Sequence, residues 1–77
     1  MAQAYILIQT EVGRATVIAD RIRQLPGVLT AEDVTGPYDV VVRVDDGAGS
    51  GFTPVVERIQ RVAGITRTLT CEVATTA

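Results

Sequence analysis

Apolar and polar residues follow two different periods along this chain, and the change of period marks the predicted elements. The first apolar run, Tyr5–Ile8, is short and contains β-branched and aromatic residues, which predicts a buried strand. From Arg14 to Leu25 apolar residues recur every three or four positions, which is typical of one face of an amphipathic helix. Pro26–Gly27 is predicted to end this helix, because proline cannot continue it and glycine allows a turn.

The rest of the chain repeats this order of elements. The pattern predicts, in sequence, a half-polar strand Val28–Thr35, a tight turn Gly36–Asp39, an apolar strand Val40–Val44, a glycine-rich loop Asp45–Gly51, an amphipathic helix Phe52–Val62 and an alternating strand Thr66–Val73. The segment Ile22–Val28 also matches Ile59–Ile65 at a constant spacing of 37 positions. A repeated unit of helix end, glycine and strand start is typical of a ferredoxin-like fold.

The predicted fold class is therefore α+β, a single ferredoxin-like βαββαβ domain over residues 1–77. Right-handed crossovers would place both helices on one face of a four-stranded antiparallel sheet. The first and third strands would be central, and the half-polar second and fourth strands would form the edges. A chain of 77 residues has room for one domain only, and a domain of this size is marginally stable without further support.

The central strands are apolar on both faces, although two helices can cover only one face. Either Tyr5 and Leu7 or Ile6 and Ile8 must therefore point away from the helices, because successive strand residues face opposite sides. An apolar sheet face of this kind predicts an interface, and sheet-on-sheet contact would give a homodimer of the dimeric α+β barrel type. A charge at an outward position of the third strand, with Val41 and Val42 as candidates, is predicted to dissociate and unfold the protein. The alternative is a lone domain with a few exposed valines.

Composition excludes several classes of function. The net charge is −2, there is no lysine, and the seven arginines are scattered, so no basic patch for nucleic acid is present. With no histidine and one cysteine, an internal disulfide framework and an ordinary zinc site are excluded, and no cofactor is expected. The lone Cys71 is predicted to be a small buried residue beside Leu69 and Val73. The longest apolar run is too short for a membrane span, and a cytoplasmic location is expected.

Two polar features remain as candidates for ligand binding, and no enzyme activity is expected. Gly36, Tyr38 and Asp39 could offer backbone N–H groups, an aromatic wall with a hydroxyl, and an anion to a free amino acid. The simpler interpretation is a hairpin turn in which Asp39 caps its own backbone. In the last strand, Thr66, Thr68 and Thr70 share one face, where they would line a polar pocket or simply face solvent.

Three segments in this order resemble the effector-binding domain of the Lrp/AsnC (feast/famine) regulators, also called the RAM domain. They are the helix exit Leu25–Val28, the turn Gly36–Asp39 before a valine strand, and the segment Gly64–Thr70. The resemblance covers nearly the whole chain, from about Ala4 to Val73. The family's regulators carry a helix-turn-helix domain ahead of this module, whereas the present sequence opens at the first strand of the sensor. It therefore resembles a stand-alone module that binds no operator DNA itself.

The resemblance implies sheet-mediated dimers that assemble into rings, commonly octamers, with an amino acid bound between dimers. Carried over residue by residue, it points to Gly36, Tyr38, Asp39, Thr68 and Thr70 as ligand-binding residues. Full-length Lrp/AsnC regulators would be further partners through mixed assembly. The glycine-rich Asp45–Gly51 segment is unusual before the second helix and bears on ligand identity.

Two other functions remain open on the residues alone. The first is a small cofactor-free dimeric α+β barrel enzyme of the monooxygenase type, which would need a cavity with polar side chains between sheet and helices. The aliphatic helix stripes and the lack of histidine favour a filled core instead. The second is an assembly module without a ligand, which a closed interface around Tyr38 and Thr68 would favour.

Overall fold

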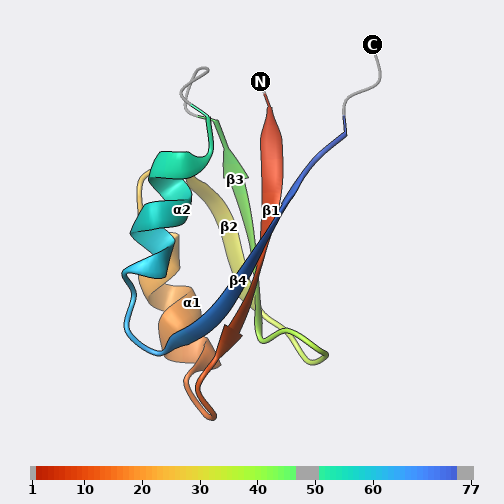
Figure 1. Cartoon of the computed structure of the whole chain (residues 1–77). Helices are drawn as coiled ribbons and strands as arrows, with labels where there is room; N and C mark the ends of the chain where they lie inside the picture. The colour runs from red at the N-terminus through yellow and green to blue at the C-terminus, as the bar shows by residue number, and fades with distance from the viewer. Residues whose placement is uncertain (1, 47–50, 75–77) are drawn as a thin grey trace.

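The computed structural model describes residues 2–46 and 51–74 of the chain. It confirms the predicted order of elements, with ends that differ from the predicted ones by one or two residues (Figure 1). The elements are β1 (Gln3–Thr10), α1 (Ala15–Arg23), β2 (Val28–Asp33), β3 (Val40–Asp45), α2 (Thr53–Gln60) and β4 (Ile65–Glu72). None of the described helices has both the length and the apolar character needed to cross a bilayer.

The four strands form one antiparallel sheet in the order β2-β3-β1-β4. The apolar strands β1 and β3 are central and the half-polar strands β2 and β4 are at the edges, as predicted. Both helices lie on the same face of this sheet, and the opposite face carries no helix (Figure 1). The predicted ferredoxin-like βαββαβ fold is confirmed.

The two halves of the fold repeat each other closely. The spacing of 37 positions relates the last residues of the helices, Arg23 and Gln60, and the first residues of the following strands, Val28 and Ile65. Between them Gly27 and Gly64 share a positive φ, of 90° and 96°, which is a backbone conformation that favours glycine. Ala31 and Thr68, 37 positions apart, each lie opposite a buried residue, Val42 on β3 and Ile8 on β1, so both face the helices.

The core lies between the helices and the inner face of the sheet. It consists of aliphatic side chains, and among the described residues no polar side chain is buried there. Ile6 and Ile8 of β1 point inward, so Tyr5 and Leu7 point away from the helices. On β3 the fully buried residues are Val40, Val42 and Val44. The prediction that Val42 is a candidate outward position is therefore wrong, and Val41 is the outward valine.

The helix-free face is formed by Tyr5, Leu7, Val41, Leu69 and Cys71, which lie together across β3, β1 and β4. Tyr5 is 40% exposed and Leu69 is 43% exposed, so large apolar side chains meet solvent here. Cys71 is also exposed, and its predicted burial is wrong for the single chain. The reason is that β4 is an edge strand and that Cys71 pairs with Tyr5 on the face that no helix covers.

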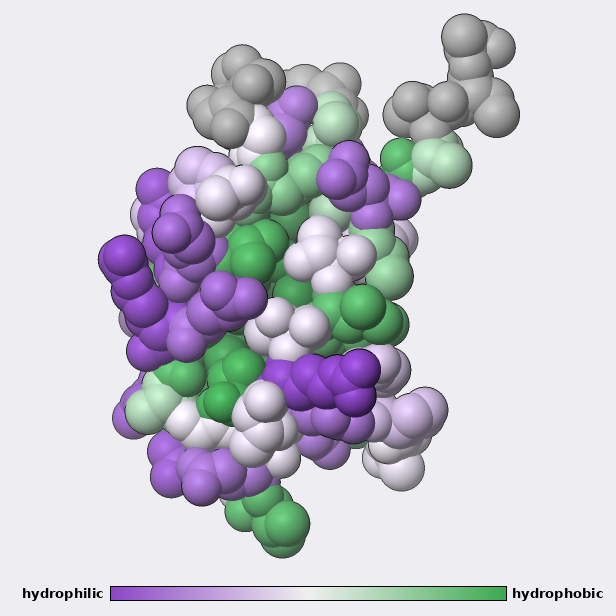
Figure 2. All heavy atoms as spheres, viewed as in Figure 1, coloured by the Kyte–Doolittle hydropathy of each residue, from purple (hydrophilic) through white to green (hydrophobic). Residues whose placement is uncertain are grey.

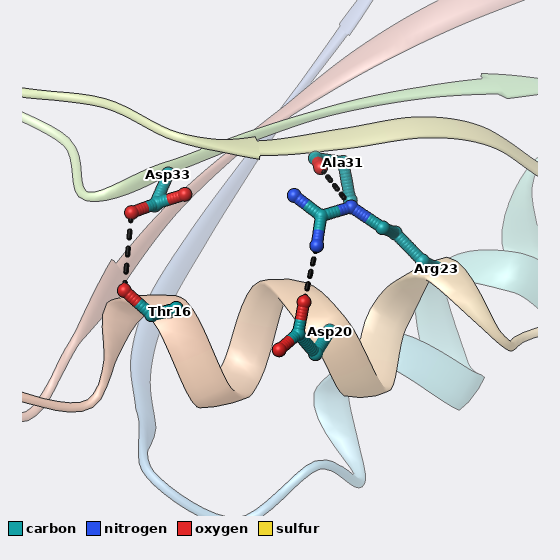
Figure 3. Close-up of polar contacts among 5 residues, drawn as sticks. All are labelled: Thr16, Asp20, Arg23, Ala31 and Asp33. Atoms are coloured by element: carbon teal, nitrogen blue, oxygen red, sulfur yellow. Dashed lines mark hydrogen bonds and ion pairs between the residues drawn. The ribbon is translucent and has the colours of Figure 1, made fainter.

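Helix α1 is held on β2 by polar contacts as well as by the core (Figure 3). The Thr16 hydroxyl donates to Oδ2 of Asp33 at 3.1 Å, and Nε of Arg23 donates to the carbonyl oxygen of Ala31 at 2.7 Å. The guanidinium of Arg23 also forms an ion pair with Asp20, one turn earlier in the helix. This side of the molecule is therefore closed by side chains of the chain itself.

Candidate functional site

Helix α2 stands away from β4, and a cleft of about 630 Å³ opens between them. The repeat supplies a physical reason for the difference from the first half. Where α1 and β2 carry Ala19 and Ala31, both buried, α2 and β4 carry the larger residues Val56 and Thr68. Small side chains let a helix approach a sheet closely, whereas β-branched side chains keep it further away. A volume of this size is in the range of small-molecule pockets.

The cleft has an apolar floor and a polar rim. Phe52 and Val56 supply the apolar part, and both pack against the core. Figure 2 shows this apolar surface in the hollow between the hydrophilic helix side and β4. The polar lining residues are two hydroxyls, one amide and three carboxylates: Thr53, Thr70, Gln60, Asp46, Glu57 and Glu72. An apolar body with a few polar groups is the chemistry that such a lining accepts.

The predicted threonines Thr68 and Thr70 lie on the helix side of β4. Thr70 lies opposite the buried Ile6 and lines the cleft, and Thr68 lies opposite Ile8. The Thr68 hydroxyl accepts a hydrogen bond of 3.1 Å from the Gln60 amide. This bond forms the boundary of the main cleft, because Thr68 and Gln60 also line a smaller hollow of about 220 Å³ on the other side.

The turn Gly36–Asp39 lies at the opposite end of the sheet from the cleft, because it precedes β3 whereas the cleft residue Asp46 follows β3 (Figure 1). Gly36 is exposed, and Tyr38 is half-buried. Asp39 bonds the neighbouring strand: its N–H donates to the carbonyl of Ile8 at 2.8 Å, and its Oδ2 accepts the N–H of Thr10 at 2.8 Å. Asp39 therefore bonds the neighbouring strand β1, whereas the simpler interpretation had it capping the backbone of its own turn. Within one chain the turn does not line the cleft with Thr70, although Asp39 and Thr68 both lie beside Ile8 of β1.

We expect Asp39→Ala to lower the free energy of unfolding by about 1–3 kcal/mol, because the partly buried Thr10 N–H loses a charged acceptor. Asp39→Asn keeps an acceptor oxygen and should recover most of this loss. Urea denaturation of the two variants and the parent chain measures the difference. Equal stability of Asp39→Ala and the parent would show that the Thr10 contact contributes nothing.

The core of the described residues differs from the polar cavity that the alternative enzyme would need. The space between sheet and helices is filled by buried aliphatic side chains, and the described polar side chains lie outside it. In residues 2–46 and 51–74 no three His, Cys, Asp or Glu side chains are gathered closely enough to hold a metal ion. The three carboxylates of the cleft are therefore spread around its rim, which fits an organic ligand better than a metal.

Five polar residues of the cleft were missed by reasoning from the sequence: Asp46, Thr53, Glu57, Gln60 and Glu72. Most of them looked like ordinary solvated positions of a helix or an edge strand. A signal was present in the repeat, because Gln60 takes the position of Arg23 and Glu57 that of Asp20. Of the glycine-rich segment Asp45–Gly51, residues 47–50 lie outside the described residues, so its predicted effect on the pocket is not tested.

Comparison with known proteins gives a family match over nearly the whole chain. The model of the Lrp/AsnC ligand binding domain matches residues 3–76. The structure is similar to that of TTHA0845 from Thermus thermophilus, with a TM-score of 0.88 and 31% identity over 100% of this chain and 98% of that one. It is also similar to the hypothetical protein PHS023 from Pyrococcus horikoshii, with a TM-score of 0.83, 26% identity and coverage of 99% and 93%.

Two further matches concern longer proteins. The fold resembles that of E. coli AsnC, with a TM-score of 0.83 and 21% identity, over 97% of this chain but 52% of AsnC. Homocitrate synthase of Sulfurisphaera tokodaii is 31% identical over 55 residues, which cover 71% of this chain. The matched segment spans only 12% of that enzyme.

Proposed function

Because the chain belongs to the Lrp/AsnC ligand-binding domain family, we propose that it is an effector-binding domain that takes an amino acid in the α2–β4 cleft. The observation that carries this proposal is the cleft itself, which pairs an apolar floor with hydroxyl, amide and carboxylate groups. An amino acid needs acceptors for its ammonium and donors for its carboxylate. The carboxylates of the rim are acceptors, and Thr53, Thr70 and Gln60 supply donors.

The functional unit in this proposal is a homodimer joined through the helix-free face. Support comes from the large apolar side chains that this face exposes in the single chain, including Tyr5 and Leu69. Burial of such a patch against a second copy is the usual reason for its existence. Dimers would then associate into a ring, as the family resemblance implies.

The turn Gly36–Asp39 would take part across subunits. In one chain Asp39 and Thr68 both lie beside Ile8 of β1, but Thr70 and the cleft lie further along the sheet, so the turn would reach the cleft from a neighbouring copy. Asp39 keeps Oδ1 for such a contact, because Oδ2 accepts the Thr10 N–H. Assembly with full-length regulators of the family would use the same surfaces and would connect the ligand to transcription.

Isothermal titration of the chain with each of the twenty amino acids tests the proposal. We expect at least one to bind, and we expect Thr70→Val to weaken that binding about fivefold to tenfold, because a donor is lost from the cleft without a change of size. Thr30→Val is the matched control, since Thr30 lies on the edge strand β2, away from the cleft. No heat with any amino acid at millimolar concentration would refute the proposed ligand.

A further inference from the structure

The repeat makes the two helix–strand contacts of the molecule directly comparable. In the first half, Thr16, Asp20 and Arg23 of α1 face β2, and their side chains close the contact (Figure 3). In the second half the equivalent positions, 37 residues later, carry Thr53, Glu57 and Gln60. All three of these residues line the α2–β4 cleft. The cleft is therefore the open counterpart of a contact that the first half closes with its own side chains.

The decisive difference between the halves is one cation. Arg23 places a guanidinium next to the Asp20 carboxylate and bonds the neighbouring strand at Ala31. Gln60 makes the equivalent contact to β4 at Thr68, but its amide carries no charge. The Glu57 carboxylate stands where Asp20 stands, and in the described part of the chain no ion pair involves it. The second half thus keeps the anion of the pair and lacks the cation.

The remaining charges of the cleft have the same sign. Asp46 and Glu72 line it together with Glu57, and no arginine is among the lining residues. Arg58 of α2 points elsewhere, because it donates to the carbonyl oxygen of Pro26. Oδ1 of Asp46 is buried and has no hydrogen-bond partner among the described residues. Asp46 therefore adds a further negative charge to the lining of the cleft.

We propose that the α2–β4 cleft selects ligands with a primary ammonium group on an aliphatic body, and that this ammonium takes the place that the Arg23 guanidinium occupies in the first half. The inference rests on the proposed function, in which this cleft is the ligand site, and it narrows the ligand to a basic amino acid or a related diamine. Phe52 and Val56 would contact the aliphatic body. Glu57 would pair with the ammonium, and Glu72 and Asp46 would add negative charge from elsewhere on the rim.

Titration of the chain with lysine, norleucine, glutamate and 1,5-diaminopentane at low ionic strength tests the proposal. Norleucine has the length of lysine without its side-chain ammonium, so the ratio of the two affinities isolates that group. We expect lysine to bind at least tenfold more tightly than norleucine, the diamine to bind, and glutamate not to bind. The preference for lysine should decrease with added salt, because charges at a rim are screened.

Variants then identify the groups responsible. Glu57→Gln should reduce the preference for lysine over norleucine about fivefold, the effect of removing one carboxylate about 4 Å from an ammonium in water. Glu32→Gln removes a carboxylate from the edge strand β2, outside the cleft, and should leave the preference unchanged. Gln60→Arg restores the cation of the first half and should abolish lysine binding. Gln60→Met, of similar length and without charge, should retain the preference.

Each outcome separates this inference from the function on which it rests. Binding of norleucine or another neutral amino acid as tightly as lysine would overturn the cation preference and leave the amino-acid function standing. Binding of the diamine alone would support the cation preference and refute the amino-acid function. Binding of none of these ligands, or lysine binding by Gln60→Arg at the parent affinity, would overturn the inference.

Discussion

Val42→Glu is expected to leave the chain unfolded at room temperature. Val42 is fully buried between β1 and β2, opposite Ile6 on one side and Ala31 on the other. The substitution loses the burial of a valine, about 1.5–3 kcal/mol. It also places a carboxyl group in an aliphatic environment, which costs several kcal/mol more even after the group is protonated. The total is comparable to the whole stability of a domain of this size, about 4–12 kcal/mol.

Circular dichroism and thermal melting of the purified variant measure this effect. Val42→Ala separates the two contributions, since it loses side-chain burial without adding a carboxyl group, and it should remain folded with a reduced midpoint. A cooperative transition of Val42→Glu within a few degrees of the parent would contradict the inward position of Val42. The result would not depend on oligomeric state, because the residue lies inside the single chain.

Val41→Glu is expected to convert the proposed dimer into a monomer. Val41 lies next to Val42 in sequence but on the helix-free face, where it is opposite Leu7 of β1. In a two-fold symmetric interface each substitution occurs twice, so two new carboxylates would be buried in the same contact. Like charges placed together in an interface cost several kcal/mol, which corresponds to a dissociation constant raised at least a hundredfold.

Sedimentation equilibrium of the parent and the variant measures the dissociation constant directly. Val17→Glu is the matched control, because Val17 is 45% exposed on α1, on the other side of the molecule, and the substitution is chemically the same. We expect Val17→Glu to keep the parent's assembly. A parent chain that is monomeric at all concentrations would refute the proposed dimer, and an unchanged Val41→Glu dimer would move the interface to another surface.

The secondary structure was predictable because its signals are local. The stripe from Ala15 to Leu25, the breaks at Gly27 and Gly64, and the alternation of the last strand each follow from neighbouring residues. The strand order was predictable too, because the length and apolar character of Tyr5–Ile8 and Val40–Val44 require central positions. The ferredoxin-like topology follows from these two kinds of information.

Which face of the sheet each strand residue points to was only partly predictable. Alternation shows that Val41 and Val42 point to opposite faces, but both are valine, so composition does not distinguish them. The sheet register decides which of the two valines points to the helices, because β3 pairs with β1 so that Val42 lies beside the buried Ile6. Cys71 was predicted to be buried for a related reason: its apolar neighbours Leu69 and Val73 show a shared face, but not what covers that face.

The candidate site shows the same limit more sharply. Thr68 and Thr70 were identified from the resemblance, and the structure places them on the helix side of β4. The turn residues were identified too, but the turn precedes β3 whereas the cleft opens where β3 ends, so Gly36, Tyr38 and Asp39 do not line the cleft. No local pattern distinguishes residues that line the cleft from residues that do not, because the difference depends on which end of β3 each segment lies at.

The amino-acid order alone predicted the secondary-structure elements, the central strands, the internal repeat and the surplus of apolar residues on the sheet. These properties depend on spacing between neighbours and on total composition, which a sequence contains completely. The cleft came from the tertiary structure, because it exists only where α2 fails to close on β4. At the positions of Ala19 and Ala31 in the first half, the second half has the larger residues Val56 and Thr68. At the position of Arg23 it has the uncharged Gln60, and the gap results from these replacements. Packing distance between elements far apart in the chain is a property that no local pattern records.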